Sequence, residues 1–433
     1  MKRILYQSLL KWKESKDRKP LIIKGARQVG KTWLMQHFGK NEYKNFVYVN
    51  FEASKHLQGI FESNFDTDRI LQAVQIETGT SISADDTLLI FDEIQEAKGG
   101  LTALKYFHEE KPSYHIVAAG SYLGISIHSQ YSFPVGKVQF LDLFPMNFIE
   151  FLWATGNDGL ASIIKQKDMN ALQIFKTKLT GILKKYYVVG GMPEVVKNFV
   201  ENDNLLKVRQ IQADILQAYE YDFGKHVPAR QIPRIKMIWD FIPVQLSKEN
   251  KKFIFGLLKK GARAKEFETA LTWLEESGLI SKIYRIKKPG FPIRSYADSS
   301  AFKIFFVDIG LLGALSDLDP KTILQGDAVF KEFKGALTEQ YVFQQLKPCF
   351  MLYYWSSERS DGEIDFIIQK QQKIIPIEVK AEENLKAKSL KSFCKKYEIT
   401  DALRFSLSDY RDEEWMQNIP LYAIENVCPD DAQ

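Results

Sequence analysis

Eight consecutive residues near the N-terminus have the types and spacing that bind phosphate groups. They are Gly25, Ala26, Arg27, Gln28, Val29, Gly30, Lys31 and Thr32, a complete G-x-x-x-x-G-K-T. The glycines let backbone N–H groups curl round a β-phosphate, Lys31 reaches the β and γ oxygens, and the Thr32 hydroxyl ligates Mg²⁺. An apolar run at 21–23 precedes the motif and a helical pattern follows it. The sequence therefore predicts a site for ATP and Mg²⁺.

A second apolar run, residues 88–91, ends in two carboxylates, Asp92 and Glu93. Four apolar residues in a row are typical of a parallel strand that is buried on both faces, and its carboxyl end opens where such sheets bind ligands. We expect Asp92 to hold Mg²⁺ through water and Glu93 to orient or deprotonate the attacking water. The alternative, a pair that only caps the next helix, is less favoured beside a P-loop.

A third apolar run, residues 115–119, ends at Gly120 and Ser121. The Ser121 hydroxyl is a candidate contact for the γ-phosphate or the lytic water. An ordinary loop or helix-capping role for Ser121 is equally favoured by the sequence.

Composition indicates an ordinary globular chain. It has 433 residues, of which 45% are hydrophobic and 26% are charged, enough for two or three domains. The three cysteines, Cys349, Cys394 and Cys428, are far apart and odd in number, so we expect neither a disulfide framework nor a zinc site. With no signal-peptide core and no spanning segment, the sequence predicts a cytoplasmic protein that has no membrane partner.

The net charge of +5 is concentrated in one segment. Residues 247–295 contain 12 Lys and Arg against 5 Glu, a net charge of +7, which is a candidate footprint for DNA or RNA. Helical patterns at 253–258 and 264–276, then strand patterns at 279–286 and 294–296, follow the order of a winged helix. Its expected nucleic-acid contacts are Arg263, Lys265, Lys287 and Lys288. A winged helix can equally pack between the domains of an ATPase.

A second group of chemically useful residues lies in the last third of the chain. Strand patterns at 363–368 and 374–380 predict a hairpin, and a two-residue turn at 371–372 would set Asp365 opposite Glu378, with Lys380 on the same face. Opposed carboxylates require a cation between them, which Mg²⁺ would supply. Such a metal could generate hydroxide from bound water, Lys380 could position that water, and Glu339 on a helix at 331–346 would be a third acid. A solvated strand face with ordinary ion pairs is the alternative.

These residues carry two resemblances. The arrangement of Asp365, Glu378 and Lys380, with Glu339 on a preceding helix, resembles the PD-(D/E)XK fold of restriction-endonuclease-like enzymes. Over nearly its whole length the chain resembles a family of bacterial and archaeal AAA+-type P-loop ATPases. In that family a C-terminal domain of unknown function contains a winged helix and a nuclease-like end. The motifs that carry this second resemblance are at residues 25–32, 89–95, 119–121, 144–148, 190–194 and 376–380.

The resemblance implies an α/β fold in five parts. These are a P-loop AAA+-type parallel-sheet core at 1–150, a helical connector at 151–246, a winged helix at 247–310, a nuclease-like domain at 311–408 and an acidic tail at 409–433. The function it implies is Mg²⁺-dependent ATP hydrolysis coupled to a nucleic-acid-directed C-terminal half, with metal-dependent nuclease activity as an option. The alternative is an ATP-driven regulatory switch whose nuclease-like domain is a binding module without catalytic activity. A homo-oligomer is a candidate assembly for this chain.

Overall fold

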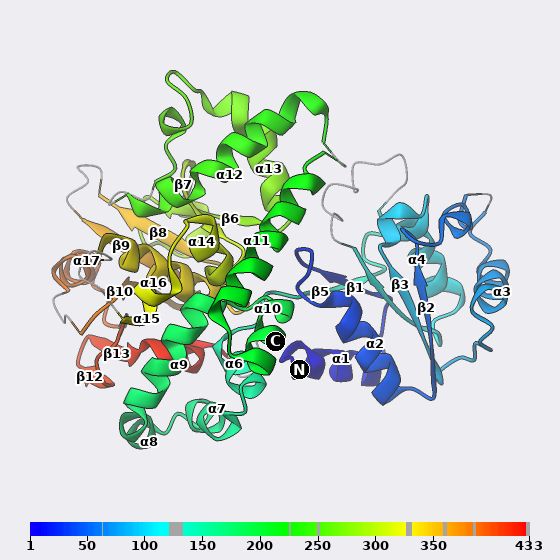
Figure 1. The fold of residues 1–433 in the computed structure, drawn as a ribbon, viewed down its shortest axis with the longest axis horizontal. Helices are drawn as coiled ribbons and strands as arrows, with labels where there is room; N and C mark the ends of the chain where they lie inside the picture. The colour runs from blue at the N-terminus through cyan, green and yellow to red at the C-terminus, as the bar shows by residue number, and fades with distance from the viewer. Residues whose placement is uncertain are drawn as a thin grey trace. The chain divides into compact units, whose positions relative to one another are not determined.

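The chain folds into two compact units, which are described separately (Figure 1). The structure is a computed structural model that describes residues 1–62, 64–120, 133–224, 227–248, 252–325, 331–357, 362–383 and 387–429. The N-terminal unit comprises Lys2–Phe144 and Glu276–Gly278. The C-terminal unit comprises Pro145–Glu275 and Leu279–Ala432.

The N-terminal unit is built on a five-stranded parallel sheet in the order β2-β3-β4-β1-β5. Its strands are β1 Leu21–Lys24, β2 Asn45–Asn50, β3 Thr87–Asp92, β4 His115–Ala119 and β5 Gln139–Asp142. Its helices are α1 Leu5–Glu14, α2 Lys31–Glu42, α3 Thr67–Thr78 and α4 Gly100–Glu110, with 3-10 turns η1 Lys55–Leu57 and η2 Ile94–Glu96. Strand β1 leads into α2, and β4 lies between β1 and β3. The carboxyl ends of β1 and β3 therefore open at the same edge of the sheet.

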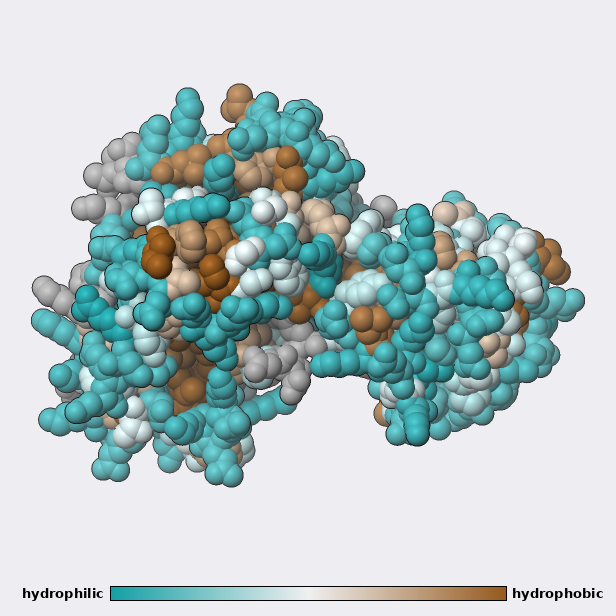
Figure 2. Space-filling view, turned by 90° about the horizontal axis from the view of Figure 1, so that it is seen from below, coloured by the Kyte–Doolittle hydropathy of each residue, from teal (hydrophilic) through white to brown (hydrophobic). Residues whose placement is uncertain are grey.

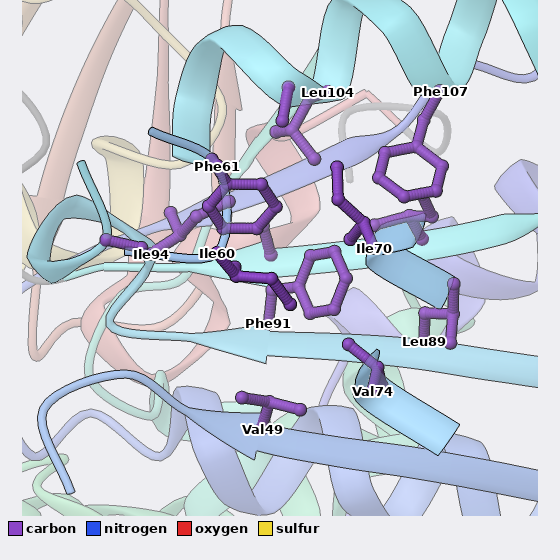
Figure 3. Close-up of a cluster of buried hydrophobic side chains, with 14 of the residues drawn as sticks. Val49, Ile60, Phe61, Ile70, Val74, Leu89, Phe91, Ile94, Leu104 and Phe107 are labelled. Atoms are coloured by element: carbon purple, nitrogen blue, oxygen red, sulfur yellow. The ribbon is translucent and has the colours of Figure 1, made fainter. Parts of the chain in front are cut away.

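Apolar side chains from the sheet and from α3 and α4 form one core of the N-terminal unit (Figure 3). Phe91 of β3 lies among Phe61, Phe107 and Ile70 there, and each is at most 1% exposed. Since burial contributes about 25 cal/mol per Å² of apolar surface, this core fixes β3 and hence the backbone of Asp92.

The C-terminal unit combines many helices with an eight-stranded mixed sheet in the order β12-β13-β11-β10-β9-β8-β6-β7 (Figure 1). Its strands are β6 Ile280–Ile286, β7 Ala297–Phe306, β8 Tyr353–Ser356, β9 Glu363–Lys370, β10 Lys373–Val379, β11 Ala402–Ser406, β12 Arg411–Glu413 and β13 Met416–Pro420. The first helices are α6 Phe148–Ala154, α7 Asp158–Lys165, α8 Met169–Ile174, α9 Lys176–Val189, α10 Pro193–Asn202, α11 Leu205–Asp222 and α12 Ile232–Ser247. The later ones are α13 Ala264–Glu276, α14 Ile309–Leu315, α15 Pro320–Gln325, α16 Lys331–Leu346 and α17 Lys388–Tyr397. The described residues of this unit also include the 3-10 segments η3 Ala229–Gln231, η4 Phe255–Leu257, η5 Ile293–Tyr296 and η7 Leu421–Val427.

Helices α16 and α17 pack on opposite faces of this sheet. Phe366 of β9 lies 5.5 Å from the ring of Phe305, which stacks on Phe343 of α16 at 4.6 Å. The next residue, Ile367, instead shares a hydrophobic cluster with Leu390 of α17. Because successive side chains of a strand point to opposite faces, α16 is placed over one set of sheet residues and α17 over the other.

The segment after residue 409 is part of the fold, so the expected acidic tail is wrong. Strand β13 lies between β11 and β12, its Asn418 is fully buried, and η7 buries Tyr422. Two of the acidic residues that suggested a tail, Asp412 and Glu413, are exposed on the edge strand β12. Edge strands commonly carry such charges, which composition alone cannot distinguish from a tail.

The winged-helix pattern is only partly followed by the structure. The helix at 264–276 is confirmed as α13, but 253–258 contains only the 3-10 turn η4, and 294–296 belongs to the 3-10 segment η5. An antiparallel hairpin is present, but its second strand is β7 at Ala297–Phe306 rather than the expected 294–296. That hairpin is not a separate wing, because β6 also pairs in parallel with β8 and so joins the eight-stranded sheet.

The cysteine prediction is also wrong. Cys349, just after α16, and Cys428, just after η7, form a disulfide, while Cys394 is free and buried. The two half-cystines are 79 residues apart, and no spacing rule for neighbouring cysteines detects such a pair.

Large exposed apolar side chains are scattered over many elements of the structure rather than gathered on one. Ile76 of α3, Val135 and Leu206 of α11 are examples, each more than 70% exposed. On the face seen in Figure 2, hydrophilic residues predominate and brown apolar areas are interspersed among them. In the described part of the chain no helix is long and apolar enough to cross a membrane.

Glu425 of η7 predicts a pH-dependent stability for the C-terminal unit. Burial raises the pKa of this carboxyl from 4.5 to about 7, with a further rise from Glu150 that Lys165 opposes. A raised pKa in the folded state means that the contribution of Glu425 is complete below about pH 4.5 and is lost as the pH rises through 7. We expect Glu425→Gln to flatten the fall in unfolding free energy over this range, measured by urea titration. The same change at exposed Glu414 should keep the wild-type slope; equal slopes for wild type and Glu425→Gln would contradict the assignment.

Candidate nucleotide site and acidic centre

The phosphate-binding motif forms the turn from β1 into α2. Gly25 has φ +149°, and a Cβ there would lie 2.2 Å from the carbonyl oxygen of Leu143, so only glycine fits. Gly30 has φ +93° and precedes the first residue of α2. The loop therefore ends at a helix N-terminus, where free N–H groups and the helix dipole favour an anion.

Lys31, the first residue of α2, is 6% exposed and lies within the loop. Its Nζ donates to the carbonyl oxygens of Gly25 and Ala26, both at 2.8 Å. Burial lowers the pKa of Lys31 to about 8, although Glu93 and Asp92 oppose this shift. This ammonium now donates to neutral carbonyls, and a bound phosphate would offer it a negatively charged acceptor. Its hydrogen bonds would become stronger, because those between two charged groups are the strongest.

Thr32 and Asp92 meet at the edge of the sheet. The Thr32 hydroxyl donates to Oδ2 of Asp92 at 2.6 Å, and the Tyr48 hydroxyl of β2 donates to the same oxygen at 3.0 Å. Burial raises the pKa of Asp92, and the Thr32 hydrogen bond acts against that rise. A hydroxyl and a carboxylate in contact are oxygen ligands of the kind that Mg²⁺ prefers, so the residues present fit this metal.

Glu93 follows Asp92 in a left-handed conformation with φ +49°. Its Oε2 accepts a hydrogen bond from Nε2 of Gln95 at 2.6 Å. A water-activating role for Glu93 requires this oxygen to be released or shared when water is bound. The third expected residue, Ser121, lies outside the described residues.

The acidic centre is defined here as Glu339, Glu363, Asp365 and Glu378 of the C-terminal unit. The predicted hairpin register is confirmed from Lys370 opposite Lys373 to Phe366 opposite Ile377, which brings Asp365 and Glu378 to the end of the ladder. Oδ2 of Asp365 accepts the backbone N–H of Val379 at 2.7 Å. The hairpin thus brings the two carboxylates together through backbone pairing.

Glu378 has cationic neighbours from the protein itself. Nζ of Lys380 lies 2.6 Å from Oε1 of Glu378, and Arg404 of β11 is its partner in the parallel ladder. Arg404 is 1% exposed, and its Nε donates to Asn418 at 2.9 Å. Burial lowers the pKa of Arg404, an effect that Glu413 and Glu378 oppose.

A lysine that the sequence did not single out completes the acidic centre. Lys303 of β7 is fully buried, forms an ion pair with Glu363, and has its Nζ 4.0 Å from Oε2 of Glu339. The same Nζ lies 4.8 Å from the centroid of the Tyr354 ring. Desolvation would lower the pKa of Lys303, but the carboxylates of Glu363, Glu339 and Asp365 outweigh it and raise the pKa. The ion pair with Glu363 thus favours the charged form of Lys303.

The arrangement does not fit the divalent metal expected here. Among the described residues, no three His, Cys, Asp or Glu side chains are placed to hold a metal ion. Glu339, which was expected as a third metal ligand, faces Lys303, and Glu378 faces Lys380. A lysine ammonium has three donors and no lone pair, so it competes with a cation for these oxygens.

The expected nucleic-acid contacts are all exposed. They are Arg263, Lys265, Lys287 and Lys288. Helix α17 adds a further basic face, because its exposed lysines recur along one side while Leu390 and Phe393 are buried on the other. These lysines are Lys388, Lys391, Lys395 and Lys396.

Sequence reasoning missed the supporting residues rather than the motif residues. Arg3 is 8% exposed, and its guanidinium donates to the carbonyls of Val29 at 2.8 Å and Phe144 at 2.6 Å, which anchors the phosphate loop. Tyr48 and Lys303 also contact groups that are far from them in the sequence. A lysine in the apolar strand 301–306 was the one usable signal, because a lysine is almost never fully buried unless it is paired.

Comparisons with known proteins identify three regions. Residues 17–152 match a family model described as an AAA domain, 180–322 match a domain of unknown function (DUF8612), and 334–424 match a second one (DUF4143). The search of curated proteins finds no match. The N-terminal unit therefore contains an AAA-type P-loop domain, and the two later regions have no assigned function.

Three solved structures show limited similarity to this chain. A Walker-type ATPase of Pyrococcus abyssi is 15% identical, with a TM-score of 0.45, over 73% of this chain and 95% of that one. Orc1 of Aeropyrum pernix in complex with DNA is 10% identical, with a TM-score of 0.30, over 72% and 90%. AMPPCP-bound DnaA of Aquifex aeolicus is 14% identical, with a TM-score of 0.27, over 63% and 86%.

Because the Tyr48 hydroxyl bonds to Asp92, its removal is expected to weaken Mg²⁺-dependent nucleotide binding. Tyr48→Phe removes a hydrogen bond to Asp92 worth about 1 kcal/mol and keeps the ring. We expect the Mg²⁺ concentration for half-maximal binding of a fluorescent ATP analogue to rise about fivefold. Tyr43→Phe, which removes a hydroxyl bonded to His115, is the matched control and should leave the half-maximal Mg²⁺ concentration unchanged. Equal behaviour of the two variants would remove Tyr48 from the site.

Proposed function

We propose that the N-terminal unit binds and hydrolyses ATP with Mg²⁺. The observation that carries the proposal is the contact between Thr32 and Asp92 beside the buried ammonium of Lys31, at the edge where β1 and β3 end. The match of residues 17–152 to an AAA domain supports it.

Each residue of this site has a role that follows from its chemistry. Backbone N–H groups of residues 25–32 cradle the phosphates, and Lys31 neutralises charge on the β and γ oxygens. Thr32 and Asp92 would hold Mg²⁺, which supplies charge stabilisation to the phosphates when bound. Glu93 takes the proton of the attacking water or orients that water. The hydrogen bond from Gln95 holds the Glu93 side chain in place.

Two substitutions separate binding from turnover. Lys31→Ala should abolish ATP binding, because the loop loses the ammonium that neutralises the phosphates. Glu93→Gln should bind ATP with unchanged affinity and lose hydrolysis by about 10²-fold or more. Binding by calorimetry and phosphate release are the measurements, with Lys40→Ala on the exposed side of α2 as the control. A full hydrolysis rate in Glu93→Gln would show that another group activates the water.

We also propose that the C-terminal unit acts on nucleic acid under control of the ATP cycle. Its support is electrostatic: the exposed Arg263, Lys265, Lys287 and Lys288, together with the lysine face of α17, offer charges suited to a phosphate backbone. The nuclease hypothesis from the sequence, metal-dependent cleavage by Asp365, Glu378 and Lys380, is the form of this proposal that the poor fit of these residues to a metal disfavours.

The second candidate is an ATP-driven switch whose nuclease-like domain is a silent binding module. The specific observation in its favour is Lys303, since the carboxylates that would hold a catalytic metal face protein cations instead. Assembly into homo-oligomers would then be the readout of ATP binding, and both forms of the proposal share the same nucleotide site.

The salt dependence of nucleic-acid binding tests the proposed contacts. Replacing Arg263, Lys265, Lys287 and Lys288 by alanine should weaken DNA or RNA binding and reduce the slope of log K against log salt by up to about 4, roughly 0.9 for each phosphate that is no longer neutralised. The control replaces four exposed lysines elsewhere in the same unit, Lys178, Lys197, Lys207 and Lys321. An equal loss in both sets would show that net charge alone is responsible.

Cleavage assays on the same protein distinguish the two candidates. Cleavage of DNA or RNA with Mg²⁺ or Mn²⁺ that disappears in both Asp365→Ala and Lys380→Ala would establish the nuclease. Intact ATPase activity without cleavage under any of these conditions would favour the silent module.

A further inference from the structure

The acidic centre holds almost as many protein cations as carboxylates. Its carboxylates come from α16, β9 and β10, and the cations from β7, β11 and the residue after β10. The carboxylates are Glu339, Glu363, Asp365 and Glu378, and the cations are Lys303, Lys380 and Arg404. Four negative and three positive charges leave a net charge of −1, too small to attract a divalent ion strongly.

We propose that Lys303 takes the place of a divalent metal ion in this centre, which therefore binds no Mg²⁺ or Mn²⁺. The inference concerns the C-terminal unit alone and holds whether or not the N-terminal unit hydrolyses ATP. Its consequence is that any nucleic-acid binding by this unit needs no divalent ion at the acidic centre.

The position of Lys303 carries the argument. Its ammonium is buried under the sheet, contacts Glu363, lies 4.0 Å from Glu339 and faces the ring of Tyr354 at 4.8 Å. A charge in such surroundings persists only when it is paired, because its desolvation costs several kcal/mol. A divalent ion at the same carboxylate oxygens would compete with this ammonium, and losing the ammonium's partners would leave a buried charge unpaired.

The opposite side of the centre is closed in the same way. Glu378 is 6% exposed, with Lys380 at 2.6 Å and Arg404 beside it in the ladder. Oδ2 of Asp365 is taken by the N–H of Val379. A hard divalent ion requires about six oxygen ligands, whereas Oε1 of Glu378 and Oδ2 of Asp365 already face protein donors.

The first experiment measures Mn²⁺ binding to the nucleotide-free full chain by calorimetry and by loss of the free Mn²⁺ resonance signal. Wild type and Asp365→Asn are compared, so that any Mn²⁺ taken up at Thr32 and Asp92 is common to both. The inference expects identical titrations. A binding site in wild type that Asp365→Asn removes would overturn it.

The second experiment removes the lysine. Lys303→Met keeps a long apolar side chain and leaves the carboxylates without their cation, so a Mn²⁺ site that wild type lacks should appear. Mn²⁺ should then raise the melting temperature of this variant alone. Adding Asp365→Asn to Lys303→Met should abolish the gained site. Lys303→Arg, which keeps the charge, and Lys282→Met, which removes the lysine paired with Glu275, should gain none.

A folded Lys303→Met that gains no Mn²⁺ site would overturn the substitution of lysine for metal. Near-ultraviolet circular dichroism establishes whether this variant is folded. If Lys303→Met is unfolded, the comparison of wild type with Asp365→Asn tests the inference by itself. Identical Mn²⁺ titrations support the inference, and a site that Asp365→Asn removes contradicts it.

Discussion

A lysine ammonium that is buried with its carboxylate partners constrains the whole C-terminal sheet. Lys303 on β7, Glu363 on β9 and Glu339 on α16 come from three elements that are held together by charge as well as by apolar packing. Removing one member of a buried ion pair typically costs about 3–5 kcal/mol, because the remaining charge has no compensation. The positions of β7, β9 and α16 are therefore linked, and residues that resemble nuclease ligands have a structural task.

A second constraint explains motif residues that take no part in the proposed chemistry. In the Gly190-Gly191 pair, a Cβ on Gly191 would lie 2.1 Å from the carbonyl oxygen of Met146. The N–H of Gly191 donates at 2.6 Å to the fully buried carboxylate of Asp308, which also accepts from Nε2 of Gln344 on α16 at 3.0 Å. This part of the family resemblance at 190–194 therefore marks close backbone packing within the C-terminal unit.

Local signals in the sequence were sufficient for the parts of the structure that depend on neighbours along the chain. The loop at 25–32, the strand before Asp92, helix α16 and the register of the β9–β10 hairpin follow from spacing and periodicity, and they agree with the structure. Lys303, Tyr48 and the Cys349–Cys428 disulfide depend on contacts between distant segments, which periodicity does not encode. The predicted Mg²⁺ between Asp365 and Glu378 stays a prediction, and the sequence did not indicate that Lys303 from another strand pairs with the neighbouring Glu363.

The two buried lysines show how environment decides function. Lys31 donates to neutral carbonyls, and desolvation lowers its pKa to about 8, so a bound phosphate would improve its surroundings. Lys303 has carboxylate partners that raise its pKa, so its charge is already compensated. Binding of a further ion would not improve the electrostatic surroundings of this ammonium. Both lysines are buried, but the ammonium of Lys31 contacts backbone carbonyls and that of Lys303 contacts carboxylates. We therefore expect the chemistry of this chain at Lys31 and a structural role for Lys303 within the sheet.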